Sequence, residues 1–253
     1  MSTSQTAARL LLMMAVCHQT LLPSSAQYKS DATYGVKAGA DVARLDGVGG
    51  MLVSEGYYSG YSFRGGTMPS VSASIFLSYR VPRTRVGLEA RMSFDALNTT
   101  TTYTDVEGFT YDFDVRLRTL GASAHVKCYV WRGLYLSAGF GYGWSLTPCD
   151  ITYTSNSQAM DWGDAVVPGD SETASELSES FSAGGRASLP LTLGYELPLG
   201  LSVEAFYARG LNDVLTTHPN RYDFGDTDNS LHTLGLLVGW GFAMDAPDKH
   251  RHR

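Results

Sequence analysis

The chain has 253 residues, among them 27 glycines and 15 tyrosines, and a formal net charge of −6 with only 17% charged residues. Its hydrophobicity excludes a disordered chain, its acidic balance argues against nucleic-acid binding, and three cysteines cannot build a disulfide-dense scaffold. After residue 26 no apolar run approaches the roughly 20 residues that a membrane-spanning helix needs.

The first 26 residues have the plan of a secretory signal peptide. A short apolar stretch, Leu10–Val16, is followed by the small residues Ser24 and Ala26, which predict cleavage after Ala26. A buried N-terminal helix is the alternative. Lipidation at Cys17 is a further alternative, which the bulky residue before that cysteine disfavours.

The remaining chain alternates apolar and polar residues over unusually long stretches, which indicates strands with one apolar face. In Val86–Ala96 the even positions are apolar and the odd positions are Gly, Ser or charged. Most of these strands span about 10 to 15 residues, as a tilted membrane strand requires and as soluble sheets rarely show. We predict strands at Tyr34–Leu45, Val71–Tyr79, Val86–Ala96, Val115–Val130, Leu134–Leu146, Arg186–Tyr195, Leu201–Leu211 and Leu231–Met244.

The connections alternate between short and long, which is typical of an outer-membrane up-and-down barrel. We therefore predict an all-β fold, an eight-stranded antiparallel transmembrane β-barrel over residues 27–244, located in the outer membrane of a Gram-negative cell envelope. A basic C-terminal tail, 245–253, follows it. A soluble lipocalin-like binder is the alternative fold. The three short periplasmic turns are Arg80–Thr84, Trp131–Gly133 and Glu196–Gly200, and the four long outer loops are 46–69, 98–114, 147–180 and 212–230.

Aromatic residues near the ends of the apolar faces predict girdles at the two membrane interfaces. These residues are Tyr34, Tyr79, Trp131, Trp144, Tyr195, Trp240 and Phe242.

The second face of the strands suits a narrow lumen filled by side chains. A charge there is costly unless it is paired, so we predict a salt-bridge network that fills the lumen. Eight strands leave no aqueous channel, so we expect no open pore; a gated path or a proton-linked site is the alternative. The ionisable residues of this face are Lys37, Asp41, Glu89, Arg91, Asp95, His125, Lys127 and Glu204.

The two cysteines after the signal peptide are expected to stay unpaired. Cys128 is predicted near the short-turn end of one strand and Cys149 beyond the long-loop end of the next. Their separation should be about 25 Å, the height of the apolar band, whereas a disulfide needs Cα atoms within about 7 Å.

The long loops hold most of the surplus acidic residues. The loop 147–180 contains seven of them and no Lys or Arg, so it could meet a protein partner or simply keep the loop soluble. We expect contacts with outer-membrane lipid, lipopolysaccharide and the barrel assembly machinery, and none with nucleic acid. The loop Asp223–Asn229 offers oxygen ligands for Ca²⁺ but lacks the full EF-hand spacing, so we predict no metal site and no cofactor.

One pair of residues raises the question of catalysis. Ser230 precedes His232 by two residues and would share its face at the start of the last strand. A Ser–His pair is the minimum for a lipid hydrolase, but nucleophile and base need not be neighbours in sequence. We expect a protein without enzymatic activity and keep the lipid-modifying enzyme as an alternative.

Five short blocks stand out across residues 34–244: Tyr34–Gly39, Leu88–Arg91, Gly139–Gly143, Leu201–Ala205 and Tyr207–Leu211. They resemble PorT-like outer-membrane β-barrel proteins. The resemblance implies an integral outer-membrane barrel and, from the founding type, an accessory role in secretion and maturation of surface proteases. The chain departs from such barrels in that eleven residues follow Phe242, although the assembly machinery commonly reads a terminal aromatic residue.

We therefore expect a structural or surface-interaction role for a barrel without an open pore. A PorT-like accessory role in secretion is the first alternative.

Overall fold

The computed structural model describes residues 31–52, 62–146, 150–156, 170–197, 199–218 and 228–244. The predicted signal peptide and the basic tail lie outside these residues. The elements are β1 (Ala32–Asp46), α2 (Gly49–Leu52), β2 (Ser62–Arg80), β3 (Val86–Thr104), β4 (Thr110–Trp131), β5 (Leu134–Ser145), β6 (Asp150–Ser155), α3 (Asp170–Ser180), β7 (Phe181–Ala183), β8 (Arg186–Glu196), β9 (Leu201–Gly210), β10 (Leu215–Thr217) and β11 (Ser230–Ala243).

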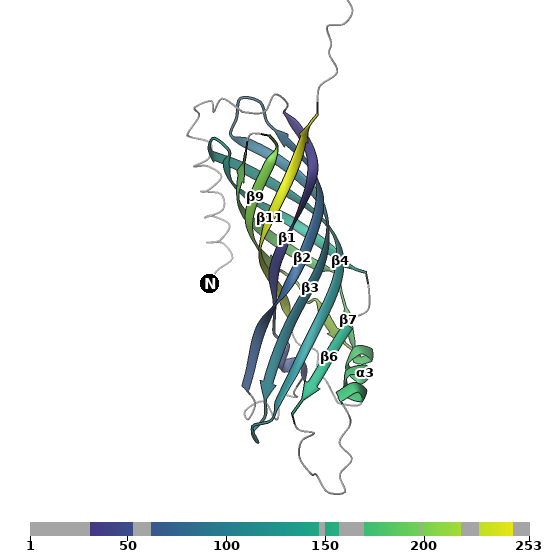
Figure 1. Ribbon diagram of the computed structural model, residues 1–253. Helices are drawn as coiled ribbons and strands as arrows, with labels where there is room; N and C mark the ends of the chain where they lie inside the picture. Colours follow the sequence, from purple (N-terminus) through teal and green to yellow (C-terminus); the bar gives the residue numbers. More distant parts are fainter. Residues whose placement is uncertain are drawn as a thin grey trace, which may run out of the picture.

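Eight long strands close into a barrel (Figure 1). Each pairs antiparallel with its neighbour in the order β1, β2, β3, β4, β5, β8, β9, β11, and β11 pairs with β1 from Thr33↔Ala243 to Asp46↔Ser230. Closure leaves no free sheet edge along the barrel wall, as a lipid environment demands. The predicted fold class is confirmed, and all eight predicted strands are present.

The two ends of the barrel differ in the way that defines its orientation. The described chain begins and ends at the same end, where Met244 N donates to Ala32 O at 2.9 Å and the connections 81–85, 132–133 and 197–200 are short. In outer-membrane barrels the short turns face the periplasm. We call this end periplasmic and the opposite end outer.

The apolar side chains of the barrel wall point outward. Ile75, Met92 and Phe140 are all more than half exposed, whereas the polar residues between such positions are buried. A water-soluble lipocalin-like barrel has the reverse arrangement, so that alternative is wrong. Alternation of this kind, apolar outside and polar inside, is the pattern of a barrel surrounded by lipid.

The outward apolar side chains form a band around the barrel, which we call the apolar belt. At the outer end, three strands continue well beyond this belt. Segment 98–114, predicted as a long loop, is instead the end of β3, a turn at 105–109 and the start of β4. Strand β2 likewise begins at Ser62, within the predicted loop 46–69, and β6 pairs with β4 from Tyr111↔Ser155 to Arg116↔Asp150. We call this four-stranded region of β2, β3, β4 and β6 the outer extension (Figure 1).

The pattern of burial reverses in the outer extension and the outer barrel rim. The inward residues become apolar and pack with α3, β7 and β10 residues, while the outward residues of β3 and β4 become Asn, Thr, Arg and Asp. This part of the molecule therefore has the core of an ordinary water-soluble domain. The core residues are Ala43, Leu45, Val48, Met51, Leu97, Phe113, Val115, Leu117, Ile151, Leu177, Phe181, Val214, Leu215 and Leu231.

The two helices of the described residues are short, and neither is long and apolar enough to cross a bilayer. Helix α3 has 11 residues and lies against β6 and β7. It buries Leu177 in the outer core and presents Glu172 outward.

Cys128 is disulfide-bonded, so the prediction of a free thiol at this position is wrong. Its partner lies outside the described residues, because Cys17 and Cys149 both do. The predicted separation of about 25 Å concerns only a pairing of Cys128 with Cys149.

Candidate functional site in the barrel lumen

A network of buried charges fills the periplasmic half of the lumen. Glu89 on β3 and Glu204 on β9 stand at its centre, with side chains 0% exposed. Lys37 on β1 bridges them, with Nζ at 2.5 Å from Glu89 Oε1 and 2.6 Å from Glu204 Oε1. Arg91 also bridges them, since its Nε donates to Glu89 and its Nη2 lies 2.8 Å from Glu204 Oε2.

The network extends to the periplasmic mouth of the barrel. Lys127 Nζ lies 2.5 Å from Glu89 Oε2 and 2.9 Å from Glu196 Oε1. Tyr129 donates its hydroxyl to Glu196 at 3.0 Å, and Tyr135 donates its hydroxyl to Glu204. Three cations thus face three carboxylates, and these six residues come from five strands of the barrel.

Aromatic rings cover the two lysines of this network. Lys37 Nζ lies 4.5 Å from the centre of the Phe76 ring, and Lys127 Nζ lies 4.5 Å from the centre of the Tyr135 ring. A cation desolvated against a ring face gains electrostatic attraction without water. Pairing and ring contacts together offset the high cost of burying these charges.

A polar cavity of about 110 Å³ lies in the middle of the lumen, next to the ionic network. Asp41, Asp95 and Arg186 face it, together with serine and threonine hydroxyls. Arg186 Nη2 donates to Thr233 at 3.0 Å and Ser93 donates to Asp95 at 2.9 Å, but Arg186 Nε and Asp41 Oδ1 have no hydrogen-bond partner within the described residues. At about 30 Å³ per molecule, the space holds a few ordered waters that can satisfy these atoms.

The eight ionisable residues predicted for the lumen all lie on its inner face. The structure brings Lys37, Glu89, Arg91, Lys127 and Glu204 into one network, while Asp41, Asp95 and His125 line the cavity above it. The Nε2 atom of His125 lies 2.9 Å from Ser123 Oγ, within the wall of the cavity.

Four further members of the lumen were missed from the sequence: Tyr129, Tyr135, Arg186 and Glu196. Tyr129 and Tyr135 are at odd positions on either side of a short turn, as Lys127 is, and odd positions face inward on both strands. Extending the alternation of β4 across the turn into β5 would therefore find them. Arg186 has the parity of Thr192, but it is the first residue of its strand, where the alternation is not yet established.

The interface aromatics do not divide evenly between the two ends of the barrel. Tyr34, Tyr79, Trp131, Trp240 and Phe242 are exposed and Tyr195 is half-buried, all six near the periplasmic end. Only Trp144 lies toward the outer end, where its ring meets the edge of Tyr142 at 5.2 Å. Tyr142 and Tyr207 are outward aromatics of the outer half that the prediction omitted.

The candidate calcium loop Asp223–Asn229 is described only at its end. The side chain of Asn229 is hydrogen-bonded to the backbone. Its Oδ1 accepts from Val214 N and Leu215 N at 2.9 Å, and its Nδ2 donates to Leu215 O at 2.7 Å. Residues 223–227 lie outside the described residues. Among the described residues no group of three or more metal-ligating side chains is present.

A closed eight-stranded barrel with an apolar exterior and a paired, buried polar interior defines an integral membrane β-barrel of the outer-membrane type. Its location is the outer membrane.

Comparison with solved structures finds surface and outer-membrane proteins. Neisserial surface protein A (NspA) has 14% identity and a TM-score of 0.39, covering 83% of this chain and 99% of its own. OprG of Pseudomonas aeruginosa has 12% identity and a TM-score of 0.39, covering 87% and 100%. Ail of Yersinia pestis has 11% identity and a TM-score of 0.34, covering 84% and 99%. No protein-family model matches the sequence, and no curated protein matches it.

Proposed function

We propose that the protein is a closed outer-membrane barrel without an open pore, which acts at the cell surface through its outer extension. The observation that carries the proposal is the filling of the lumen. The ionic network closes the periplasmic half, and the apolar core closes the outer end, with the polar cavity enclosed between them. A hydrated ion would have to break the first and penetrate the second.

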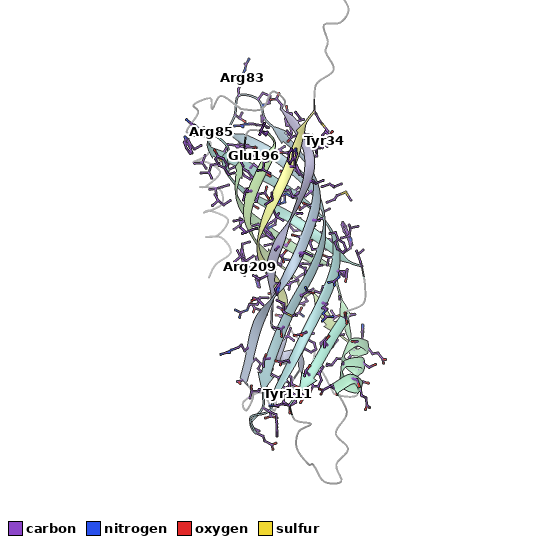
Figure 2. All side chains as sticks on the ribbon, viewed as in Figure 1. Tyr34, Arg83, Arg85, Tyr111, Glu196 and Arg209 are labelled. Atoms are coloured by element: carbon purple, nitrogen blue, oxygen red, sulfur yellow. The ribbon has the colours of Figure 1, made fainter. Side chains whose placement is uncertain are left out.

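The outer extension supports a role at the surface because it is built as a stable sheet. Four aromatic rings stack across its strands: Phe63 on Tyr103 at 5.9 Å, Tyr103 on Tyr111 at 4.5 Å, and Tyr111 on Tyr153 at 6.3 Å between ring centres. Such cross-strand aromatic contacts hold neighbouring strands in register. The ladder thus stiffens the part of the molecule that Figure 2 places farthest from Tyr34 and Glu196, where Tyr111 marks the tip.

The partner that fits this surface is cationic. Asp112 and Asp150 are exposed on the sheet, Glu172 on α3 and Glu107 at the β3–β4 turn. Asp150 also lies 3.9 Å from the exposed Arg116, so the other three acidic residues carry this argument. The described parts of the acidic segment 147–180, strand β6 and helix α3, form one side of the extension. Lipopolysaccharide and outer-membrane lipid surround the apolar belt in this proposal, and the barrel assembly machinery inserts the barrel.

A first experiment measures conductance of the purified full-length mature chain in planar bilayers. The closed lumen predicts no conductance steps at neutral pH. Regular steps from folded, heat-modifiable protein would contradict it and favour the gated path.

A second experiment assigns the working surface. A strain lacking the protein is complemented with variants that lack 147–180 or 245–253, after both are shown to reach the outer membrane folded. Failure of the first variant with success of the second supports action at the surface. The opposite result favours the PorT-like accessory role in secretion, which would act through the periplasmic turns and the tail.

A further inference from the structure

A polar cluster lies on the outside of the barrel wall, at the outer edge of the apolar belt on β9, β11 and β1. Ser230 and His232 share the outward face of β11, since Leu231 and Thr233 between and beyond them are buried. On the neighbouring β1, Asp46 lies opposite Ser230 and Arg44 lies opposite His232. The cluster is separate from the lumen network, which faces the other side of the wall.

The imidazole of His232 is held between two hydroxyls. Ser230 Oγ lies 3.1 Å from His232 Nε2, and the Tyr207 hydroxyl lies 3.1 Å from His232 Nδ1. The Tyr207 and His232 rings are stacked, with 6.2 Å between centres and 5° between planes. When Nδ1–H donates to the Tyr207 oxygen, Nε2 carries the lone pair and accepts the Ser230 proton, which is the arrangement a general base needs.

Negative charge lies where a protonated imidazole would need it. Asp46 Oδ2 is 3.7 Å from His232 Nε2, and the histidine side chain is 20% exposed. The other oxygen of this carboxylate, Oδ1, accepts from Arg44 Nε at 2.7 Å. An imidazolium formed by taking the serine proton is therefore stabilised by a carboxylate within ion-pair distance. The pair is also open to a molecule arriving from outside the barrel.

The depth of the cluster matches the ester region of the outer leaflet. Leu234, the next outward residue on β11, is 57% exposed and belongs to the apolar belt. Arg44 and Arg209, both exposed, flank the pair on the neighbouring strands β1 and β9. Figure 2 shows Arg209 between the periplasmic end and the tip at Tyr111, as expected for a residue at the outer membrane boundary. Arginines bind phosphate well, and the ester carbonyls of a lipid lie just below its phosphate.

We propose that Ser230 and His232 form a nucleophile–base pair that hydrolyses acyl esters of phosphate-bearing lipids in the outer leaflet. Ser230 Oγ attacks the ester carbonyl carbon while its proton passes to His232 Nε2. The proton then passes to the leaving alcohol as the ester C–O bond breaks, which leaves an acyl-serine. A water gives its proton to His232 Nε2 and attacks the acyl carbon; the proton returns to Ser230 Oγ and the fatty acid is released.

The roles of the surrounding residues follow from their positions. Arg209 attracts the phosphate together with the terminal nitrogens of Arg44, whose Nε donates to Asp46. Tyr207 is a positioning residue that fixes the imidazole. This inference departs from the expectation of a protein without enzymatic activity. It goes beyond the proposed surface role and does not depend on it, because the pair faces away from the closed lumen.

The experiment uses the folded mature chain in vesicles and measures fatty acid release by mass spectrometry. One arm contains phosphatidylglycerol and the other contains lipopolysaccharide, so that the two sources of a phosphate-bearing ester are distinguished. A fluorophosphonate probe is added in a parallel reaction, in which Ser230 Oγ bonds to phosphorus and fluoride leaves with the proton. We expect release in at least one arm and one labelled serine.

The variants decide whether this pair is responsible. Ser230→Ala should abolish release and labelling, and His232→Ala should lower release by about 100-fold or more. The exposed Ser62→Ala on β2 is the matched control and should change neither. Tyr207→Phe should shift the pH profile of release while the barrel remains heat-modifiable. No release above protein-free vesicles in either arm, or undiminished release by Ser230→Ala, would overturn the proposal.

Discussion

Glu204 illustrates at the scale of one residue how the lumen is stabilised. Its carboxylate accepts from Tyr135 and contacts Lys37 and Arg91, with its side chain wholly buried. Replacing it with alanine removes one of the two carboxylates that Lys37 and Arg91 each contact and leaves a buried positive charge uncompensated. Breaking a buried pair in this way costs about 3–5 kcal/mol.

We therefore expect Glu204→Ala to lower the free energy of unfolding by that amount, measured by urea unfolding in lipid vesicles. Glu107→Ala, at the exposed β3–β4 turn, is the control and should change it by less than about 0.5 kcal/mol. An equal effect of the two substitutions would contradict the assigned role of the network.

At the turn between β8 and β9 we expect one substitution to raise the free energy of unfolding. Leu199 is 93% exposed and has a φ of 87°, a conformation that costs an L residue about 1–2 kcal/mol and glycine very little. Leu199→Gly should stabilise the barrel by about 1 kcal/mol in the same unfolding assay. At the next residue, Gly200→Ala should destabilise it, because a Cβ there would lie 2.1 Å from Gly241 O.

The lumen residues could be predicted wherever inward and outward residues alternate regularly along a strand. Glu89, Arg91 and Lys127 follow from simple alternation in β3 and β4. The ion pairs between them did not follow, because the partners come from strands up to 167 residues apart in sequence and depend on the stagger of the closed barrel.

At the scale of elements, the outer extension is the part that sequence reasoning missed. Residues 98–104 are one Asn, five Thr and one Tyr, which read as a polar loop when strands are sought by apolar alternation. Threonine is β-branched and favours strands, and Thr99 and Thr101 are buried at 2% and 5% exposure. The eight membrane strands were found because their outward face had to be apolar, a demand that ends where the belt ends.

The aromatic ladder makes the extension testable apart from the barrel. Tyr111 stacks on both Tyr103 and Tyr153 and donates its hydroxyl to Asp105 at 2.8 Å. Tyr111→Ala should speed amide hydrogen exchange in the ends of β3 and β4 and in β6, by about 5-fold for a loss near 1 kcal/mol. Exchange in the membrane half of β4 should not change; a uniform increase along β4 would show that extension and barrel unfold as one unit.

At the scale of the whole molecule, closure predicts resistance to detergent. All eight barrel strands are hydrogen-bonded on both sides. In isolated outer membranes the unboiled protein should therefore run at a different position from the boiled protein on a denaturing gel. Equal mobility, with the protein in the soluble periplasmic fraction, would contradict the membrane assignment.

The reversal of burial along β3 and β4 has a consequence for how deep the protein sits in its membrane. Toward the outer end, the outward residue after Leu120 on β4 is Arg118. On β3 only Ala96 lies between the outward residues Phe94 and Asn98. Sinking by one outward position, about 6.6 Å along a strand, would draw the Arg118 guanidinium and the Asn98 amide into hydrocarbon, and rising by as much would expose apolar side chains to water. The outward residues of β3 and β4 therefore fix the depth of the barrel in the outer leaflet, and they hold the outer extension at one height above the lipid.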